Sequence, residues 1–185
     1  VLNKFKERTK LDIITKIPRV AYRESITKKA EAQYKHKKQS GGHGQYGEVH
    51  IRVQPQERGK GFEFVDSIVG GVVPKQYIPG VEKGLREGME EGVLARFPVV
   101  DVWTELYYGS FHAVDSSEMA FKIAARQALK AAMEEAGPQI LEPVMKVRIF
   151  ADKEFMGDIM SDITSRRGRV LGMDSSDDNE SNISV

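Results

Sequence analysis

The 185-residue sequence contains no cysteine, which excludes a disulfide framework and any thiolate metal site. Its four histidines are scattered without ligand-like spacing, so we expect no metal site of another kind. No apolar run approaches the ~20 residues that a membrane span requires. The N-terminus also has no signal-peptide pattern. Together these absences predict a cytoplasmic protein with no membrane contact.

The P-loop motif G-x-x-x-x-G-K-[ST] is also missing, so we expect no nucleotide, cofactor or catalytic residue within this chain. What is present suits a folded protein. Hydrophobic residues make up 40% of the sequence, enough for a real core. The length fits one large domain, or one domain joined to fragments of others.

The net charge of only +1 hides a strong local asymmetry. Residues 16–60 hold eleven Lys and Arg but only four acidic residues. A basic field of this kind attracts phosphate backbones and adds a salt-dependent contribution to affinity that ignores base sequence. The alternative is a solvated hairpin whose lysines protect its edges. Charge alone does not separate the two.

The stretch Gly42–Gly47 reads GHGQYG and matches the dinucleotide-binding pattern G-x-G-x-x-G. In that role the glycines follow an apolar strand and open a helix. Here residues 34–40 are polar and partly basic, and residues 48–53 alternate polar and apolar as a strand does. The surroundings therefore predict a loop between two strands, a protruding tip that meets RNA and does not cradle a cofactor.

Periodicity and turn residues predict an alternation of helices and strands. Helices are expected over residues 1–9, 75–91, 115–135 and 154–167. Strands are expected over residues 11–15, 20–39, 48–54, 62–69, 99–108 and 145–149, with a short one near Val170. The last β-α-β is half of a two-layer unit.

Two local signals refine the helices. Asp115, with Glu118 three residues on, has the spacing of a capping box and is expected to be an N-cap rather than a catalytic carboxylate. Gly80, Gly84, Gly88 and Gly92 recur every four residues and would share one helix face. Since each interior glycine costs about 1 kcal/mol relative to alanine, we expect another backbone to pack closely there.

Six segments resemble the elongation factor G family, in the family's order and across nearly the whole chain. They are 20–25 (VAYRES), 41–47 (GGHGQYG), 70–75 (GGVVPK), 109–124 (GSFHAVDSSEMAFKIA), 141–143 (LEP) and 166–173 (RRGRVLGM).

The resemblance implies an α+β fold made of parts of three domains. Residues 1–18 would end the third domain. Residues 19–140 would form the fourth domain, a β-α-β fold like domain 2 of ribosomal protein S5 with a left-handed crossover, an exception to the usual right-handed rule. Residues 144–185 would be the first half of an incomplete, ferredoxin-like fifth domain.

The resemblance also implies a function. The family's fourth domain reaches the decoding region of the small ribosomal subunit and helps transfer RNA and messenger RNA to advance. The expected partners are the ribosome, tRNA and mRNA, and the expected state is a monomer. A GTPase domain using GTP and Mg²⁺ would lie upstream. The alternatives are a ribosome-protection or recycling paralogue on the same scaffold and, less favoured, a nucleotide-binding enzyme domain.

The residues expected to contact RNA lie on two tips and on the basic arm beside the first. They are Gly41, Gly42, His43, Gly44, Gln45, Tyr46, His112, Lys37 and Lys38. The resemblance implies that Gln45 faces the codon–anticodon duplex. A side-chain amide both donates and accepts hydrogen bonds, so it can bind the 2′-hydroxyls of an A-form minor groove without selecting a particular base. Glycines let backbone N–H groups approach the RNA.

For three of these residues, roles that involve no contact with RNA remain open. Gln45 would then be an ordinary polar loop residue, His112 would only hold its turn, and Tyr46 would pack at the loop base instead of stacking on a base. His43 stands where the family commonly has Arg, which removes a permanent charge and a bidentate phosphate donor. That departure fits a paralogous branch resembling elongation factor G.

Overall fold

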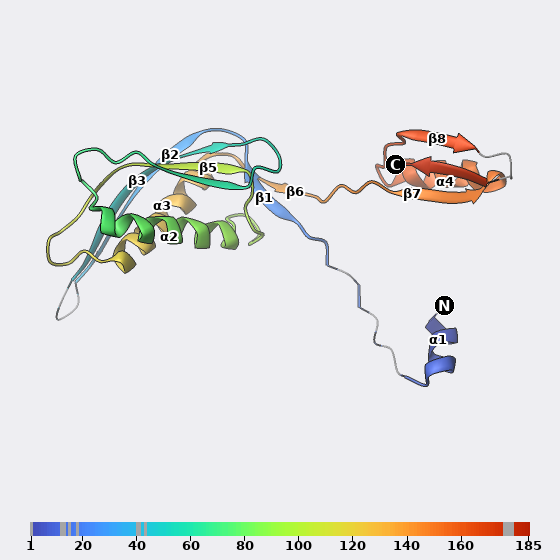
Figure 1. Ribbon diagram of the computed structural model, residues 1–185, viewed down its shortest axis with the longest axis horizontal. Helices are drawn as coiled ribbons and strands as arrows, with labels where there is room; N and C mark the ends of the chain where they lie inside the picture. Colours follow the sequence, from blue (N-terminus) through green and yellow to red (C-terminus); the bar gives the residue numbers. More distant parts are fainter. Residues whose placement is uncertain are drawn as a thin grey trace. The chain divides into compact units, whose positions relative to one another are not determined.

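The computed structural model describes residues 2–11, 14, 16–17, 19–39, 42, 44–175 and 180–185. The chain divides into two compact units, Val1–Glu142 and Pro143–Val185 (Figure 1). Both units mix helices with strands, so the predicted α+β class is confirmed. Among the described residues, no helix has the length and apolarity to cross a membrane.

The N-terminal helix α1 (Leu2–Thr9) agrees with the prediction for residues 1–9. The strand predicted over residues 11–15 is not formed at Leu11 or Ile14, which are outside any strand and exposed. A strand needs a partner to satisfy its backbone, and apolar alternation alone does not provide one. The other three residues of that stretch lie outside the described residues.

The first unit is built on a four-stranded sheet of order β2-β3-β5-β4. Its strands are β2 (Ala30–Lys38), β3 (Gln45–Pro55), β4 (Phe62–Asp66) and β5 (Val102–Ser110). β2, β3 and β5 run antiparallel, and β4 runs parallel to β5. The parallel pair is connected through a helix, which is the crossover expected from the resemblance; its left hand stays a prediction.

The single arm predicted over residues 20–39 is in fact two strands. The chain bends at residues 27–28, and β1 (Arg23–Ile26) pairs with β6 (Pro138–Leu141) in a separate two-stranded sheet. Leu141, the first residue of the LEP segment, therefore belongs to a strand. The boundary between the two units falls between Glu142 and Pro143.

Both long helices of the first unit lie on the same side of its sheet (Figure 1). They are α2 (Ile78–Glu91), preceded by the short helix η1 (Lys75–Tyr77), and α3 (Glu118–Glu135). The alternate β3 residues Val49, Ile51 and Val53 are buried under them. The opposite face of β3, which carries polar side chains, is left uncovered by these helices.

The glycine row of α2 packs against α3 as predicted. A Cβ on Gly80 would meet Glu118, one on Gly84 would overlap the backbone oxygen of Lys122, and one on Gly88 would lie 2.8 Å from Leu129 Cδ2. Gly92 does not belong to this face, which corrects the prediction. It follows the helix in the left-handed region, with φ of 62°.

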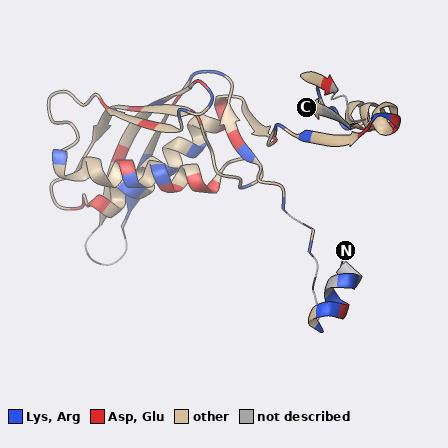
Figure 2. Ribbon diagram, turned by 45° about the vertical axis from the view of Figure 1, so that its right-hand side comes forward, with Lys and Arg blue, Asp and Glu red and all other residues tan. Residues whose placement is uncertain are grey.

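Charged residues of opposite sign stand beside one another along α2 and α3 (Figure 2). Lys122 lies 2.7 Å from Glu87, and Arg126 lies 2.6 Å from Glu91. These ion pairs join the two helices along their exposed edge.

The second unit has a three-stranded antiparallel sheet of order β7-β9-β8 and one main helix. Its elements are β7 (Arg148–Asp152), η2 (Lys153–Phe155), α4 (Met156–Ser165), β8 (Gly172–Ser175) and β9 (Glu180–Ser184). The predicted β-α-β is present, but β9 was not predicted because its residues are polar apart from Ile183, which is buried. β9 lies between the other two strands.

Candidate nucleic-acid interface

The glycine motif forms the turn of the β2–β3 hairpin. Lys38 pairs with Gln45, so residues 39–44 connect the strands. The strand-to-strand turn is therefore as predicted, but Gln45, Tyr46 and Gly47 belong to β3 and not to the loop. Gly41 and His43, both predicted to contact RNA, lie outside the described residues.

The second tip, residues 111–117 between β5 and α3, is joined directly to the hairpin. The backbone N–H of Tyr46 donates to the carbonyl of Asp115 at 2.9 Å. The Ser116 hydroxyl donates to the carbonyl of Tyr46, also at 2.9 Å. Two segments far apart in sequence thus form one tip with a fixed mutual position.

Asp115 is not the helix cap that its spacing predicted. The N-cap is Ser117, whose hydroxyl accepts from the Ala120 N–H at 3.1 Å. Asp115 Oδ1 instead accepts the backbone N–H of Gly44 at 3.0 Å. A Cβ at residue 44 would lie 2.8 Å from Asp115 Cγ, so glycine permits this contact. Through this hydrogen bond, Asp115 holds the glycine loop against the second tip.

His112 holds its own turn and still presents a second ring nitrogen. Its Nδ1 accepts the backbone N–H groups of Val114 at 3.3 Å and of Asp115 at 3.2 Å. This geometry places the proton of the neutral ring on Nε2, which is left to donate. Nδ1 also lies 3.4 Å from Asp115 Oδ2, a contact that becomes an ion pair when the ring is protonated.

Gln45 is exposed, and one half of its amide is engaged. Its Oε1 lies 2.9 Å from Nε2 of His36 on the neighbouring strand. That bond uses the carbonyl of the amide and leaves the NH₂ group to donate to a ligand. His36 was not singled out in the sequence, and only the hairpin register reveals it.

Tyr46 packs at the base of the loop, the second of its two predicted roles. Its hydroxyl donates to Glu48 Oε2 at 3.1 Å. Ser110 Oγ and Lys35 Nζ reach the same oxygen at 2.7 and 3.1 Å, and His50 Nε2 lies 3.3 Å from Oε1. Burial alone would raise the pKa of Glu48, but these hydrogen bonds outweigh it and lower the pKa to about 2.

Most of the predicted RNA-contacting residues line one shallow hollow of about 270 Å³. Six of the nine are among its lining: Lys37, Lys38, Gly44, Gln45, Tyr46 and His112. Gln39 and Asp115 complete the lining, and Gly42 is exposed but does not belong to it. The structure thus brings the two predicted tips and the basic arm together.

Two basic residues of the hairpin that line this hollow have no acidic partner among the described residues. Lys35, Arg52, Arg58 and Lys60 each pair with a carboxylate. Within the part of the chain that the structure describes, neither Lys37 nor Lys38 has a carboxylate within ion-pair distance. Lys37 and Lys38 therefore bring two positive charges without an acidic partner to the hollow.

Residues 18–137 match the family model "Elongation factor G, domain IV", and residues 139–185 match "Elongation factor G C-terminus". The chain belongs to the elongation factor G family. Over 176 residues it is 54% identical to an elongation factor G-like protein of Thermotoga maritima, covering 95% of this chain and 26% of that protein. It also matches a crystal structure of a Thermus thermophilus protein with a TM-score of 0.85 and 44% identity, over 99% of this chain and 28% of that one.

The chain therefore spans about a quarter of the length of these relatives. It is a region of a translation elongation factor, and the family match confirms the resemblance read from the six sequence segments. All nine predicted RNA-contacting residues fall within the part that matches domain IV.

Proposed function

We propose that this region contacts RNA on the ribosome through its two joined tips and promotes the movement of tRNA and mRNA on the small subunit. Its partners would be the decoding region, the tRNA and the mRNA. The observation that carries the proposal is the hollow in which Gln45, His112 and two lysines meet, within the segment that matches domain IV.

The chemistry of the hollow suits RNA recognised by shape. The Gln45 NH₂ and the His112 Nε2–H are donors that 2′-hydroxyls and phosphates accept. Lys37 and Lys38 would add an attraction to phosphates that is independent of sequence. A factor that meets every codon needs contacts of this kind, because base-specific readout would favour some codons over others.

The nucleotide-binding alternative has no support from the geometry. A G-x-G-x-x-G turn places the pyrophosphate at the N-terminus of the following helix. Here Gly42–Gly47 leads into strand β3, so the motif does not open a helix. GTP and Mg²⁺ would be bound by a separate GTPase domain of the parent protein, and this region would supply no catalytic residue.

The proposal is tested with the full-length protein and ribosomes in a single-round translocation assay. Gln45→Ala removes one hydrogen bond worth about 1 kcal/mol and should slow translocation about fivefold, with more frameshifting. Gln33→Ala, an exposed glutamine earlier on β2, is the matched control and should leave the rate unchanged. Equal rates for the wild type and both variants would contradict the tip assignment.

A second candidate is a ribosome-recycling or ribosome-protection factor built on the same scaffold. It is favoured by one observation, the description of the 54% identical relative as elongation factor G-like. Subunit splitting and drug rescue, measured beside translocation, separate the two functions. Splitting or rescue without translocation would select this candidate.

A further inference from the structure

His36, on β2, contacts the side chain that the proposed function places against RNA. Its ring Nε2 lies 2.9 Å from Oε1 of Gln45. The ring is half-buried, whereas Gln45 is exposed. Among the described residues, the His36 ring makes no other hydrogen bond or ion pair, so no second group competes with Gln45 for this nitrogen.

The register of the hairpin brings the two side chains together. His36 is opposite Gly47 and Gln45 is opposite Lys38, so His36 and Gln45 are diagonal neighbours on one face of the sheet. Gly47 has no side chain to fill the space opposite the ring, which leaves the ring free to lean toward Gln45. A Cβ at residue 47 would lie 3.0 Å from the backbone of Ala120, so the close approach of α3 disfavours a side chain there.

This hydrogen bond decides which half of the Gln45 amide is presented to a ligand. Oε1 can only accept, so Nε2 of His36 carries the proton in this contact. A neutral ring protonated at Nε2 donates in this way, and so does a charged ring. The NH₂ group is then turned away from the ring. Lys37 and Lys38, which line the same hollow, have only donors and cannot hold that NH₂ group in their turn.

We propose that His36 is a positioning residue for the RNA contact: by donating to the Gln45 carbonyl, it presents the amide NH₂ group, which selects acceptor atoms of the RNA. This role rests on the proposed function, because it orients the same amide. Phosphates and 2′-hydroxyls accept hydrogen bonds, and every base pair offers acceptors in its minor groove. An outward carbonyl would favour guanine, whose amino group is the donor among the base edges of that groove. His36 therefore keeps the contact independent of base sequence.

The orientation is tested without RNA, on the 185-residue chain isotope-labelled for nuclear magnetic resonance. At about pH 8, where an ordinary histidine ring is neutral, the ring nitrogen shifts should place the His36 proton on Nε2. Gln45→Ala should shift the Nε2 signal, because that N–H loses its acceptor. A proton on Nδ1, or an Nε2 signal that is unchanged in Gln45→Ala, would overturn the proposal.

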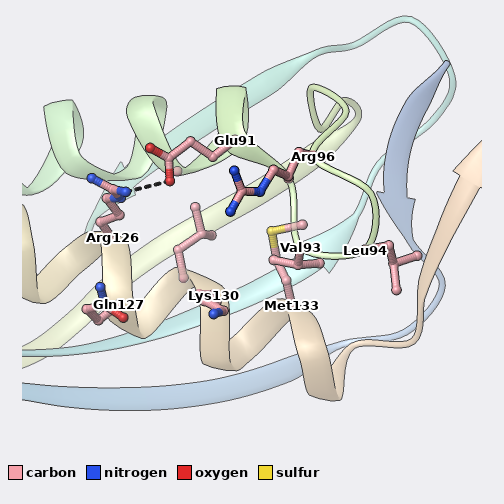
Figure 3. Close-up of a pocket in the computed structure, with 11 residues that line it drawn as sticks. Glu91, Val93, Leu94, Arg96, Arg126, Gln127, Lys130 and Met133 are labelled. Carbon is pink, nitrogen blue, oxygen red and sulfur yellow. Dashed lines mark ion pairs between the residues drawn. The ribbon is translucent and has the colours of Figure 1, made fainter.

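Gln127→Ala is the matched control for the loss of a side-chain amide. Gln127 lies on α3 and lines a separate hollow, beside Arg126 and Lys130 (Figure 3). Its replacement should leave the ring signals of His36 and the rate of translocation unchanged.

The effect on function is measured by a double-mutant cycle in the single-round translocation assay with the full-length protein. His36→Phe keeps an aromatic ring but removes the donor. The amide is then free to take either orientation, and translocation should slow about twofold. In the Gln45→Ala background the same substitution should have no further effect, because no amide is left to orient.

The outcomes separate the role of His36 from the proposed function. If Gln45→Ala leaves the rate unchanged, the proposed function fails and the role of His36 fails with it. If Gln45→Ala slows translocation but His36→Phe does not, or slows it equally in both backgrounds, only the role of His36 is overturned. The position of the ring proton is measured in the wild type, so it decides the question even if His36→Phe folds poorly.

Discussion

Glu48 lies at the base of the tip proposed to contact RNA, and its carboxylate contacts the Tyr46, Ser110 and Lys35 side chains. Its pKa of about 2 lies below the 4.5 of an unperturbed Glu, so the ionised form is favoured by folding. The shift corresponds to about 3 kcal/mol of stability above pH 4.5, lost as the pH falls toward 2. Glu48→Gln should therefore lower the free energy of unfolding at pH 7 by about that amount, measured by urea denaturation.

The difference between wild type and Glu48→Gln should shrink as the pH is lowered from 5 toward 2. Glu63→Gln, an exposed carboxylate on β4, is the control and should change stability by less than about 0.5 kcal/mol. A difference that stays constant across this pH range would show that the carboxylate charge is not what holds the tip.

Ser117 caps α3 in place of the predicted Asp115, and substitutions of the two residues separate their roles. Ser117→Ala removes the N-cap of α3 and should cost about 1 kcal/mol of stability. Asp115→Ala should leave the helix intact but speed hydrogen exchange at the Gly44 amide, because that N–H loses its acceptor. An unchanged exchange rate of the Gly44 amide in Asp115→Ala would contradict the hydrogen bond by which Asp115 holds the glycine loop.

The sequence could indicate Gln45, His112 and the two lysines as a group, because the motifs that carry them are local. It could not assign Asp115, since both it and Ser117 are good cap residues in the right place. The deciding contact joins Asp115 to Gly44, 71 residues earlier. His36 and Glu48 escaped notice for the same reason, because their partners depend on strand register.

Among the elements, the α2–α3 contact depends on glycine at specific turns. Gly84→Ala would place a methyl group against the backbone oxygen of Lys122, which cannot move without displacing α3. We expect a loss of about 1–3 kcal/mol despite the better helix propensity of alanine. Thermal unfolding of the 185-residue chain measures it.

Gly88→Ala is the matched substitution one turn later on the same helix. Its methyl group would meet only the flexible end of Leu129, so the loss should be clearly smaller. If the two variants unfold at the same temperature, the close approach of backbones at Gly84 is not what the glycine row provides.

Helices were easier to predict than strands in this chain. α2 and α3 have strong periodicity and clear end signals, and both occur close to the expected bounds. The break between β1 and β2 and the presence of β9 depend on which strand pairs with which, and a polar strand such as β9 has little pattern of its own. Local periodicity does not predict which distant segments pair as strands.

For the whole molecule, the six ordered segments indicated the family correctly, because several motifs in one order are far more specific than any single motif. The α+β class followed from them. The assignment of residues 1–18, 19–140 and 144–185 to the third, fourth and fifth domains stays a prediction, as do GTP hydrolysis and ribosome binding by the parent protein.

The central claim is that the joined tip around Gln45 touches RNA when the full-length protein is on the ribosome. The direct test places a benzoylphenylalanine photo-crosslinker at position 45, with position 57 on the exposed turn after β3 as the control. The account predicts crosslinks from position 45, and not from position 57, to small-subunit RNA, tRNA or mRNA. Crosslinks to RNA from position 57 alone, or from neither position on bound ribosomes, would contradict it.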